Sequence, residues 1–228
     1  SMGSLSFYFG NHMTTIEGGM ILTSDFETAD ILKSTRSHGL VKKSARVDNY
    51  PEFPDKNFIF DMTGYNLRST NINAAIGLAQ FRKLDQWISI RRQNHQRFLE
   101  RIKELDVISQ KVDLKESTSF CLPLIFRTKE QKEYVLKNLA RKGIEGRPVV
   151  AGNLLRQPVF RTMGLRADKT PIADLIHDNG LYLPNNQFIT PEKVDYMVDG
   201  VKELLQEIPD AFVMLKRQGD GIVTALVN

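Results

Sequence analysis

Residues 6–19 read SFYFGNHMTTIEGG, and this stretch connects two short apolar runs at residues 5–9 and 19–23. Both runs are bordered by glycine and polar turn residues, the pattern of short β-strands. The glycine pair that follows Glu17 favours a tight turn, in which we expect Glu17 to bond backbone groups. The stretch is therefore predicted to form two strands joined by a polar loop around Asn11.

Composition narrows the class of protein. The 228 residues suffice for one large or two small domains, and 41% hydrophobic with 25% charged residues is ordinary for a globular protein. Lysine and arginine are scattered among acidic residues, unlike the clustered stripe of a nucleic-acid binder, and the net charge of +4 suits a small anionic ligand. Cys121 is the only cysteine, which excludes an internal disulfide and fits a reducing cytoplasm. We find no apolar run of about 18 residues for a membrane span and no metal-ligand spacing of His, Asp and Glu.

Helix signals and apolar runs alternate along the rest of the chain. A capping box at Ser24 should open a helix that runs to about Ser37, and residues 40–63 look like a long irregular loop, functional or disordered. His95 lies near one face of a predicted helix and is expected to be structural. Further helices are predicted at 71–84 and 85–105 and after the capping residues Thr128, Thr170 and Thr190, with strands at 107–112, 120–126 and 144–150. This alternation indicates an α/β or α+β chain.

Five local motifs in a fixed order carry a family resemblance. They lie at residues 11–19, 36–39, 64–68, 72–78 and 147–148. Together they resemble the DegT/DnrJ/EryC1/StrS sugar aminotransferases. The resemblance implies an α/β, aspartate-aminotransferase-like fold (PLP fold-type I), with a partial large cofactor domain at 1–84, a complete small C-terminal α+β domain at 85–208 and a tail at 209–228. In the family the first motif lies well inside the large domain, so we expect most of the cofactor pocket to come from a segment upstream of this chain.

In the family the first motif reads S-F-x-x-x-K-x-x-T-x-x-E-G-G, and its lysine forms the Schiff base with pyridoxal phosphate. Asn11 holds the lysine position, and an amide cannot form an imine with an aldehyde. A lysine-less branch, of the GDP-4-keto-6-deoxymannose 3-dehydratase type, reads S-F-x-x-x-H-H. This chain matches its second histidine with His12 and departs from it at Asn11. The region of Arg147 and residues 179–181 also look similar to that branch.

The resemblance implies an enzyme of nucleotide-sugar metabolism in the cytoplasm, acting in the deoxysugar synthesis of surface polysaccharides such as the lipopolysaccharide O-antigen. It would dehydrate a nucleotide-linked 4-keto-6-deoxyhexose at C3, as a homodimer. The implied cofactor is pyridoxal 5′-phosphate or pyridoxamine 5′-phosphate, and the implied amino donor is glutamate. An imidazole suits this chemistry because it moves protons near neutral pH and does not recapture the cofactor as a lysine would.

Asn11 leaves several alternatives open, because an amide is neither an acid nor a base. His12 could serve as the base, or a histidine-to-asparagine substitution could have been introduced to trap an intermediate. The protein could instead be a natural non-catalytic relative, a fragment or pseudoenzyme that acts through dimerisation. A further alternative is a nucleotide-sugar 4-aminotransferase relative whose Schiff-base lysine has been replaced.

The remaining candidate site residues follow from the other motifs. In the family, the asparagine matching Asn66 reaches the cofactor phosphate of the partner subunit, and Arg68 could add charge-assisted bonds. Arg147 is a candidate clamp for the sugar or its diphosphate. Arg36 and His38 are candidate substrate contacts, and their place at a helix end equally suits a role in complementing the helix dipole. The motif also makes Glu17 a candidate for the cofactor site.

Overall fold

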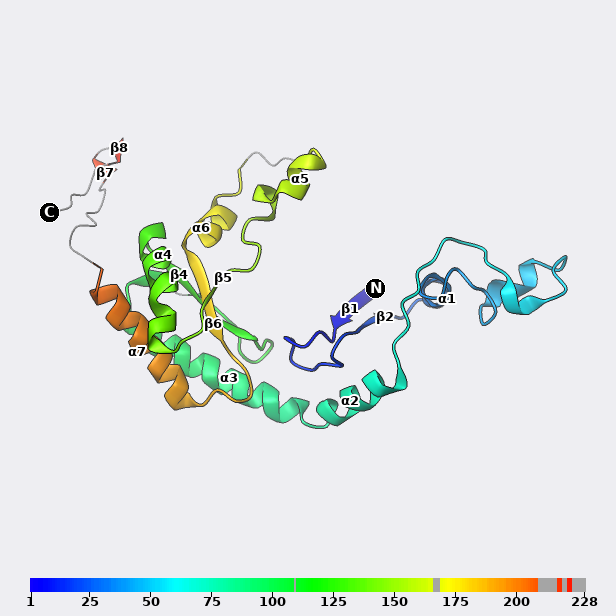
Figure 1. Cartoon of the computed structure of the whole chain (residues 1–228), viewed down its shortest axis with the longest axis horizontal. Coiled ribbons are helices and arrows are strands. Elements are labelled where there is room, and N and C mark those ends of the chain that lie inside the picture. Colours follow the sequence, from blue (N-terminus) through cyan, green and yellow to red (C-terminus); the bar gives the residue numbers. More distant parts are fainter. Residues whose placement is uncertain (109, 166–168, 209–216, 219–220, 223–228) are drawn as a thin grey trace. The chain divides into compact units, whose positions relative to one another are not determined.

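The computed structural model describes residues 1–108, 110–165, 169–208, 217–218 and 221–222. The chain divides into two compact units, Ser1–Asp85 and Gln86–Asn228 (Figure 1). The predicted tail, 209–228, lies outside the described residues apart from the short strands β7 (Arg217–Gln218) and β8 (Gly221–Ile222). Each unit is considered separately below.

The first unit begins with an antiparallel hairpin of β1 (Met2–Ser6) and β2 (Gly19–Thr23). The predicted strand at residues 19–23 is confirmed. The other strand lies three residues earlier than predicted, because the chain already turns at Tyr8, whose carbonyl accepts a hydrogen bond from Asn11 N at 3.0 Å. The loop between the two strands is therefore longer than the sequence suggested.

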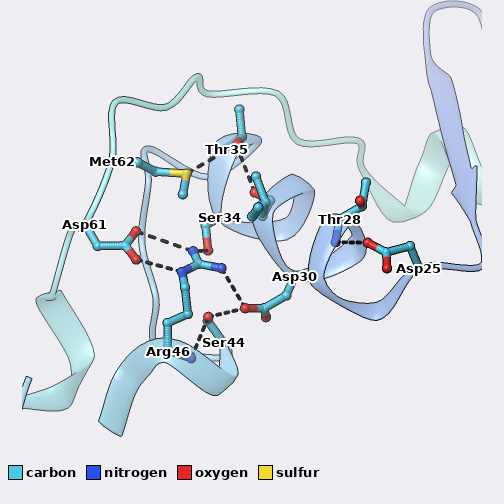
Figure 2. A network of polar contacts seen from close by, with 10 residues as sticks. Asp25, Thr28, Asp30, Ser34, Thr35, Ser44, Arg46, Asp61 and Met62 are labelled. Atoms are coloured by element: carbon cyan, nitrogen blue, oxygen red, sulfur yellow. Dashed lines mark hydrogen bonds and ion pairs between the residues drawn. The ribbon is translucent and has the colours of Figure 1, made fainter. Parts of the chain in front are cut away.

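Helix α1 (Phe26–Thr35) follows the hairpin. Its N-cap is Asp25, whose carboxylate accepts a hydrogen bond from Thr28 N at 2.7 Å (Figure 2). The predicted cap at Ser24 is wrong by one residue, because Asp25 is an equally good capping residue and takes the extended backbone and the hydrogen bond of the cap. Arg36 caps the other end of the helix.

Residues 40–63, predicted to be irregular, contain two 3₁₀ turns, η1 (Ala45–Asn49) and η2 (Lys56–Phe58). The two ends of this segment meet where Val41 N donates to Ile59 O at 3.0 Å, and both side chains are buried. Helix α2 (Asn71–Phe81) follows, with a capping box between Thr70 and Asn73. It starts as predicted and ends three residues early, in a turn at residues 82–83.

The second unit is built on a four-stranded antiparallel sheet. The strands β3 (Val107–Ile108), β4 (Cys121–Phe126), β6 (Gly180–Pro184) and β5 (Arg147–Pro148) lie in the order β3-β4-β6-β5. Two predicted strands are much shorter than expected, at 107–108 and 147–148, and β6 was not predicted as a strand. Leu122, Leu124 and Phe126 alternate along β4 and are fully buried, so one face of the sheet carries the core.

Helices complete this unit. The long α3 (Leu84–Arg101) ends in the 3₁₀ turn η3 (Ile102–Glu104), short of the predicted end at residue 105. Helix α4 (Lys129–Asn138) has the predicted capping box, and α7 (Pro191–Gln206) the predicted threonine cap and proline. The chain also forms η4 (Leu139–Lys142), η5 (Leu154–Arg156), α5 (Pro158–Thr162) and α6 (Pro171–Asn179). The core joins α3, α4 and α7 to the sheet, through residues that include Phe98, Val135, Leu139, Val194, Val198, Val201 and Leu204.

Candidate active site

Asn11 lies in the loop between β1 and β2, and its side chain bonds within the loop. The amide nitrogen Nδ2 donates to Ser6 O at 3.1 Å and to Ser6 Oγ at 2.8 Å. These bonds tie the loop back to the end of β1. An amide held in this way stabilises the loop and supplies no proton-transfer group at position 11.

The loop is anchored to helix α2 by residues whose role the sequence did not reveal. Thr14 N donates to Gln80 Oε1 at 2.9 Å, and Asn73 Nδ2 donates to Thr15 O at 2.6 Å. Gly77 allows the close approach, because a Cβ there would lie 2.8 Å from Thr15 Cγ2. The motif at residues 72–78 therefore holds the Asn11 loop in place.

His12 and Glu17 occupy the same loop. His12 is half-buried beside Asn11, whereas Glu17 is exposed. The carbonyl of Glu17 accepts a hydrogen bond from Thr15 Oγ1 at 2.8 Å. The expected bonds from the Glu17 side chain to the backbone are not among the hydrogen bonds of the described residues, so the turn depends on threonine hydroxyls.

A second group of predicted residues comes together in a short antiparallel ladder. Ser37 pairs with Asn66, and the adjacent bonds run from Tyr65 N to Thr35 O (2.6 Å), from His38 N to Tyr65 O (2.8 Å) and from Leu67 N to Arg36 O (2.9 Å). The motifs at 36–39 and 64–68 are thus neighbours in space. We call this paired segment, residues 35–39 with 61–68, the motif ladder.

The motif ladder presents Arg36, His38, Asn66 and Arg68, all four of them exposed. Two guanidinium groups, an imidazole and an amide form a donor set that suits an anionic ligand. In the described residues no hydrogen bond joins this group to the Asn11 loop. The structure therefore gives two candidate groups in the first unit.

Two glycines allow the motif ladder to form. A side chain at Gly39 would overlap the carbonyl of Met62, and one at Gly64 would overlap the backbone nitrogen of Gly39. Gly39 also has φ 83°, in the left-handed region that favours glycine. Gly39 therefore lets the two chain segments approach closely.

Arg147 belongs to the second unit, on the strand β5. Its guanidinium is exposed and contacts Glu145 Oε1 at 2.6 Å. The hydrogen bond to this carboxylate raises the pKa of Arg147 further. A clamp for a diphosphate would have to exchange this partner for the ligand, and the exposure of both residues makes that exchange inexpensive.

Other kinds of site have little support in the part of the chain that the structure describes. It contains no cluster of three or more His, Cys, Asp or Glu side chains suited to a metal. None of its helices is both long and apolar enough to cross a membrane. A shallow depression of about 390 Å³ in the second unit is lined by residues none of which is a predicted site residue: Arg92, Gln93, Gln96, Arg97, Glu100 and Leu114.

Comparison with known proteins supports the predicted fold. The model of the DegT/DnrJ/EryC1/StrS aminotransferase family matches residues 1–202. GDP-4-keto-6-deoxy-D-mannose 3-dehydratase from Escherichia coli O55:H7 is 31% identical over 211 residues, which are 88% of this chain and 54% of that protein. The chain spans about half the length of the curated relatives it matches.

Solved structures give the same result. A GDP-4-keto-6-deoxymannose-3-dehydratase with a trapped PLP-glutamate geminal diamine has a TM-score of 0.74 at 29% identity, covering 88% of this chain and 54% of that one. A mutant of this enzyme in which asparagine replaces a histidine, with bound GDP-perosamine, has a TM-score of 0.75 at 31% identity with the same coverage. The predicted fold class, PLP fold-type I, is confirmed by this likeness.

Proposed function

The chain belongs to the DegT/DnrJ/EryC1/StrS aminotransferase family. From this premise we propose that it is part of a nucleotide-sugar 3-dehydratase. The reaction would remove the C3 hydroxyl of a nucleotide-linked 4-keto-6-deoxyhexose during surface-polysaccharide synthesis. The dehydratases among its relatives support this substrate class.

The observation that carries the proposal is the absence of an amine from the loop that holds lysine in the family. Asn11 occupies that position, and the first lysine of the sequence is Lys33, beyond β2 and within α1. Transamination by this family requires the lysine, whereas the dehydratase branch works without it. The loop therefore favours dehydration over transamination.

We propose pyridoxal 5′-phosphate or pyridoxamine 5′-phosphate as the cofactor, with glutamate as the amino donor. The donor set of the motif ladder fits the cofactor phosphate: Asn66 Nδ2 and the Arg68 guanidinium are exposed on a backbone fixed by hydrogen bonds. When bound, the cofactor supplies the electron sink that allows a proton to be removed and a hydroxyl to leave. The PLP-glutamate adduct in a neighbouring structure supports both choices.

The other proposed contacts go to the substrate and to a second subunit. Arg36 and His38 would bind the anionic part of the nucleotide sugar, and Arg147 would hold the sugar or its diphosphate. Because Asn66 would serve the partner's cofactor, we propose a homodimer. His12 is the nearest acid–base group in the sequence to position 11, and it would move the proton if this chain is active with Asn11.

A second candidate is a non-catalytic role, which the bonds of Asn11 favour. In the described residues both hydrogen bonds of its side chain go to Ser6, so the amide holds the loop against the end of β1. The dehydratase mutant with asparagine and bound GDP-perosamine supports the idea that a member of this family with such a replacement can still hold a nucleotide sugar.

An activity assay separates these candidates. The chain, joined to the upstream half of the cofactor domain that the family resemblance implies, is incubated with pyridoxamine 5′-phosphate, glutamate and a GDP-linked 4-keto-6-deoxyhexose, and mass spectrometry follows loss of the C3 oxygen. General acid–base catalysis contributes about 100- to 10,000-fold, so Asn11→His should raise turnover by that order. Loss of an existing activity in His12→Ala would identify His12 as the base. No product from either the wild type or Asn11→His would refute the dehydratase proposal and leave the non-catalytic one.

A further inference from the structure

Arg46 lies outside all the motifs, yet it is the centre of a polar network in the first unit (Figure 2). It sits in η1, in the segment that the sequence suggested was irregular. Its Nε donates to Asp61 Oδ2 at 2.7 Å, and its two terminal nitrogens donate to Asp30 Oδ2 at 2.6 Å and to Ser34 Oγ at 2.9 Å. Ser44 adds a hydrogen bond to Asp30. One guanidinium thus joins α1, η1 and the start of the motif ladder.

The burial of this network makes Arg46 hard to replace. The side chains of Asp30 and Asp61 are only 7% and 5% exposed, against 23% for Arg46. Among the ion pairs of the described residues, Arg46 is the only cation that contacts either carboxylate. The hydrogen bond that Arg46 donates to Asp61, together with the nearby charge of Asp30, raises the pKa of Arg46 and keeps it charged. Loss of the guanidinium would leave two nearly buried carboxylates uncompensated.

Asp61 transmits this anchoring to the motif ladder. Its backbone N donates to Gly39 O at 3.2 Å, and the next residue, Met62, accepts a hydrogen bond from Thr35 Oγ1 at 3.4 Å. Further along the two segments, Ser37 pairs with Asn66 in an isolated bridge. Asp30 and Ser34 fix the other side, because both belong to α1, whose end leads into residues 35–39. Arg46 therefore bonds Asp61 in one segment of the ladder and the helix that leads into the other segment.

We propose that Arg46 is a positioning residue for the phosphate-binding group of Asn66 and Arg68. It touches neither residue. Its planar guanidinium group bonds Asp61 on one side and Asp30 with Ser34 on the other. These bonds set the register in which residues 61–68 lie against residues 35–39. This inference rests on the proposed function for its ligand, and on the contacts of Arg46 for its geometry.

The geometric part is tested by amide hydrogen exchange, measured by NMR on the full chain. Arg46→Lys keeps the positive charge but loses the planar set of guanidinium donors, and Asp61→Asn keeps the side-chain shape but loses the negative charge. Both should speed exchange at the amides of Tyr65 and Leu67 by about tenfold or more, because charge-assisted hydrogen bonds are lost. The control Asp25→Ala removes the cap at the far end of α1 and should leave those amides unchanged. Unchanged exchange in both network variants, or equal acceleration in the control, would overturn the proposal.

The part of the proposal that concerns the ligand is tested by measuring the affinity of the protein for pyridoxamine 5′-phosphate and for pyridoxamine, which lacks the phosphate. Arg46→Lys should weaken binding of the first by about tenfold and leave the second unchanged, since only the phosphate contacts are displaced. Asn66→Ala should do the same, and the double variant should lose less than the product of the two effects, because both act on one contact. The proposal would be overturned if Arg46→Lys sped amide exchange in the motif ladder but still bound pyridoxamine 5′-phosphate in preference to pyridoxamine as the wild type does. If the wild type itself shows no such preference, the proposed cofactor role fails, while the exchange experiment still decides the role of Arg46 in positioning the ladder.

Discussion

At position 11 the chemistry of a single side chain limits what the whole loop can do. Lysine would offer an amine, histidine an acid–base group, and asparagine offers hydrogen bonds alone. The structure shows those bonds in use, from Asn11 Nδ2 to the carbonyl and hydroxyl of Ser6. The residue is therefore well integrated into the loop, whatever its catalytic consequence.

The first prediction concerns covalent attachment of the cofactor at this residue. In the wild type, borohydride reduction with added pyridoxal phosphate should leave no phosphopyridoxyl group on residues 7–18, because the loop has no amine. Asn11→Lys should introduce that label, and Asn11→Gln should not. Peptide mass mapping after proteolysis gives the result. A reduced label on the wild-type loop would contradict the family alignment at position 11.

A second residue-scale prediction concerns His95, which the sequence suggested was structural. It is 2% exposed, its two ring nitrogens have no hydrogen-bond partner in the described structure, and burial lowers its pKa. The unfolded chain binds this proton first as the pH falls below about 6.5. The free energy of unfolding should therefore be fully retained above about pH 6.5 and should decrease as the pH falls, by up to about 1.4 kcal/mol per pH unit.

The comparison that checks it is denaturant unfolding of the wild type and His95→Leu between pH 7.5 and 5. The variant should lose this part of the pH dependence. His38→Gln, at an exposed histidine, is the matched control and should keep it. Parallel pH profiles for all three proteins would show that His95 is already protonated in the fold or that its burial is relieved.

At the scale of single elements, several helix starts were predictable because capping bonds are local, although α6 begins after Thr170 without a side-chain capping bond. The third prediction uses the capping box of α4, where Gln131 N donates to Thr128 Oγ1 and Thr128 N donates to Gln131 Oε1, both at 3.2 Å. Thr128→Ala should destabilise the second unit by about 1 kcal/mol, whereas Thr128→Ser should cost much less. Urea unfolding followed by a probe in that unit measures both. Equal stability of the alanine and serine variants would argue against the cap.

Elements that depend on distant residues were predicted less well. The strand β6 has an apolar centre, but it is recognised only by its pairing with β4, where Leu183 lies opposite Leu122. The Arg46 network is similar: its ion pairs join residues 16 and 15 positions apart, across a segment with no helix or strand pattern. For the site, the pairing of Ser37 with Asn66 shows that the motifs at 36–39 and 64–68 are neighbours in space, while their role in binding stays a prediction. Gln80, which helps to hold the Asn11 loop, carried no signal in its local sequence, and the motif that contains Asn73 did not reveal the bond from Asn73 to Thr15.

At the scale of the whole molecule, the two units differ in how they bury apolar surface. The second has a continuous core that joins three helices to a sheet. In the first, every residue of β1 is exposed, as are four of the five in β2. Large apolar side chains are exposed along the region of residues 58–84 as well, among them Phe58, Phe60, Tyr65, Leu67, Ile72, Leu78 and Phe81. Exposed apolar surface on this scale is typical of an interaction surface.

The last prediction assigns part of that surface to a second copy of the chain. If residues 58–84 form the dimer contact, the protein should self-associate, and Ile72→Asp should weaken association by at least tenfold, because a charge would be buried in an apolar contact. Ile72 is 71% exposed, and Val150 in the second unit, 76% exposed, provides the matched control. Sedimentation equilibrium over a wide concentration range measures both variants. A strict monomer at high concentration, or equal weakening by Val150→Asp, would count against this surface. A dimer that Ile72→Asp breaks and Val150→Asp leaves intact would place the contact beside Asn66, where a residue reaching the partner's cofactor has to lie.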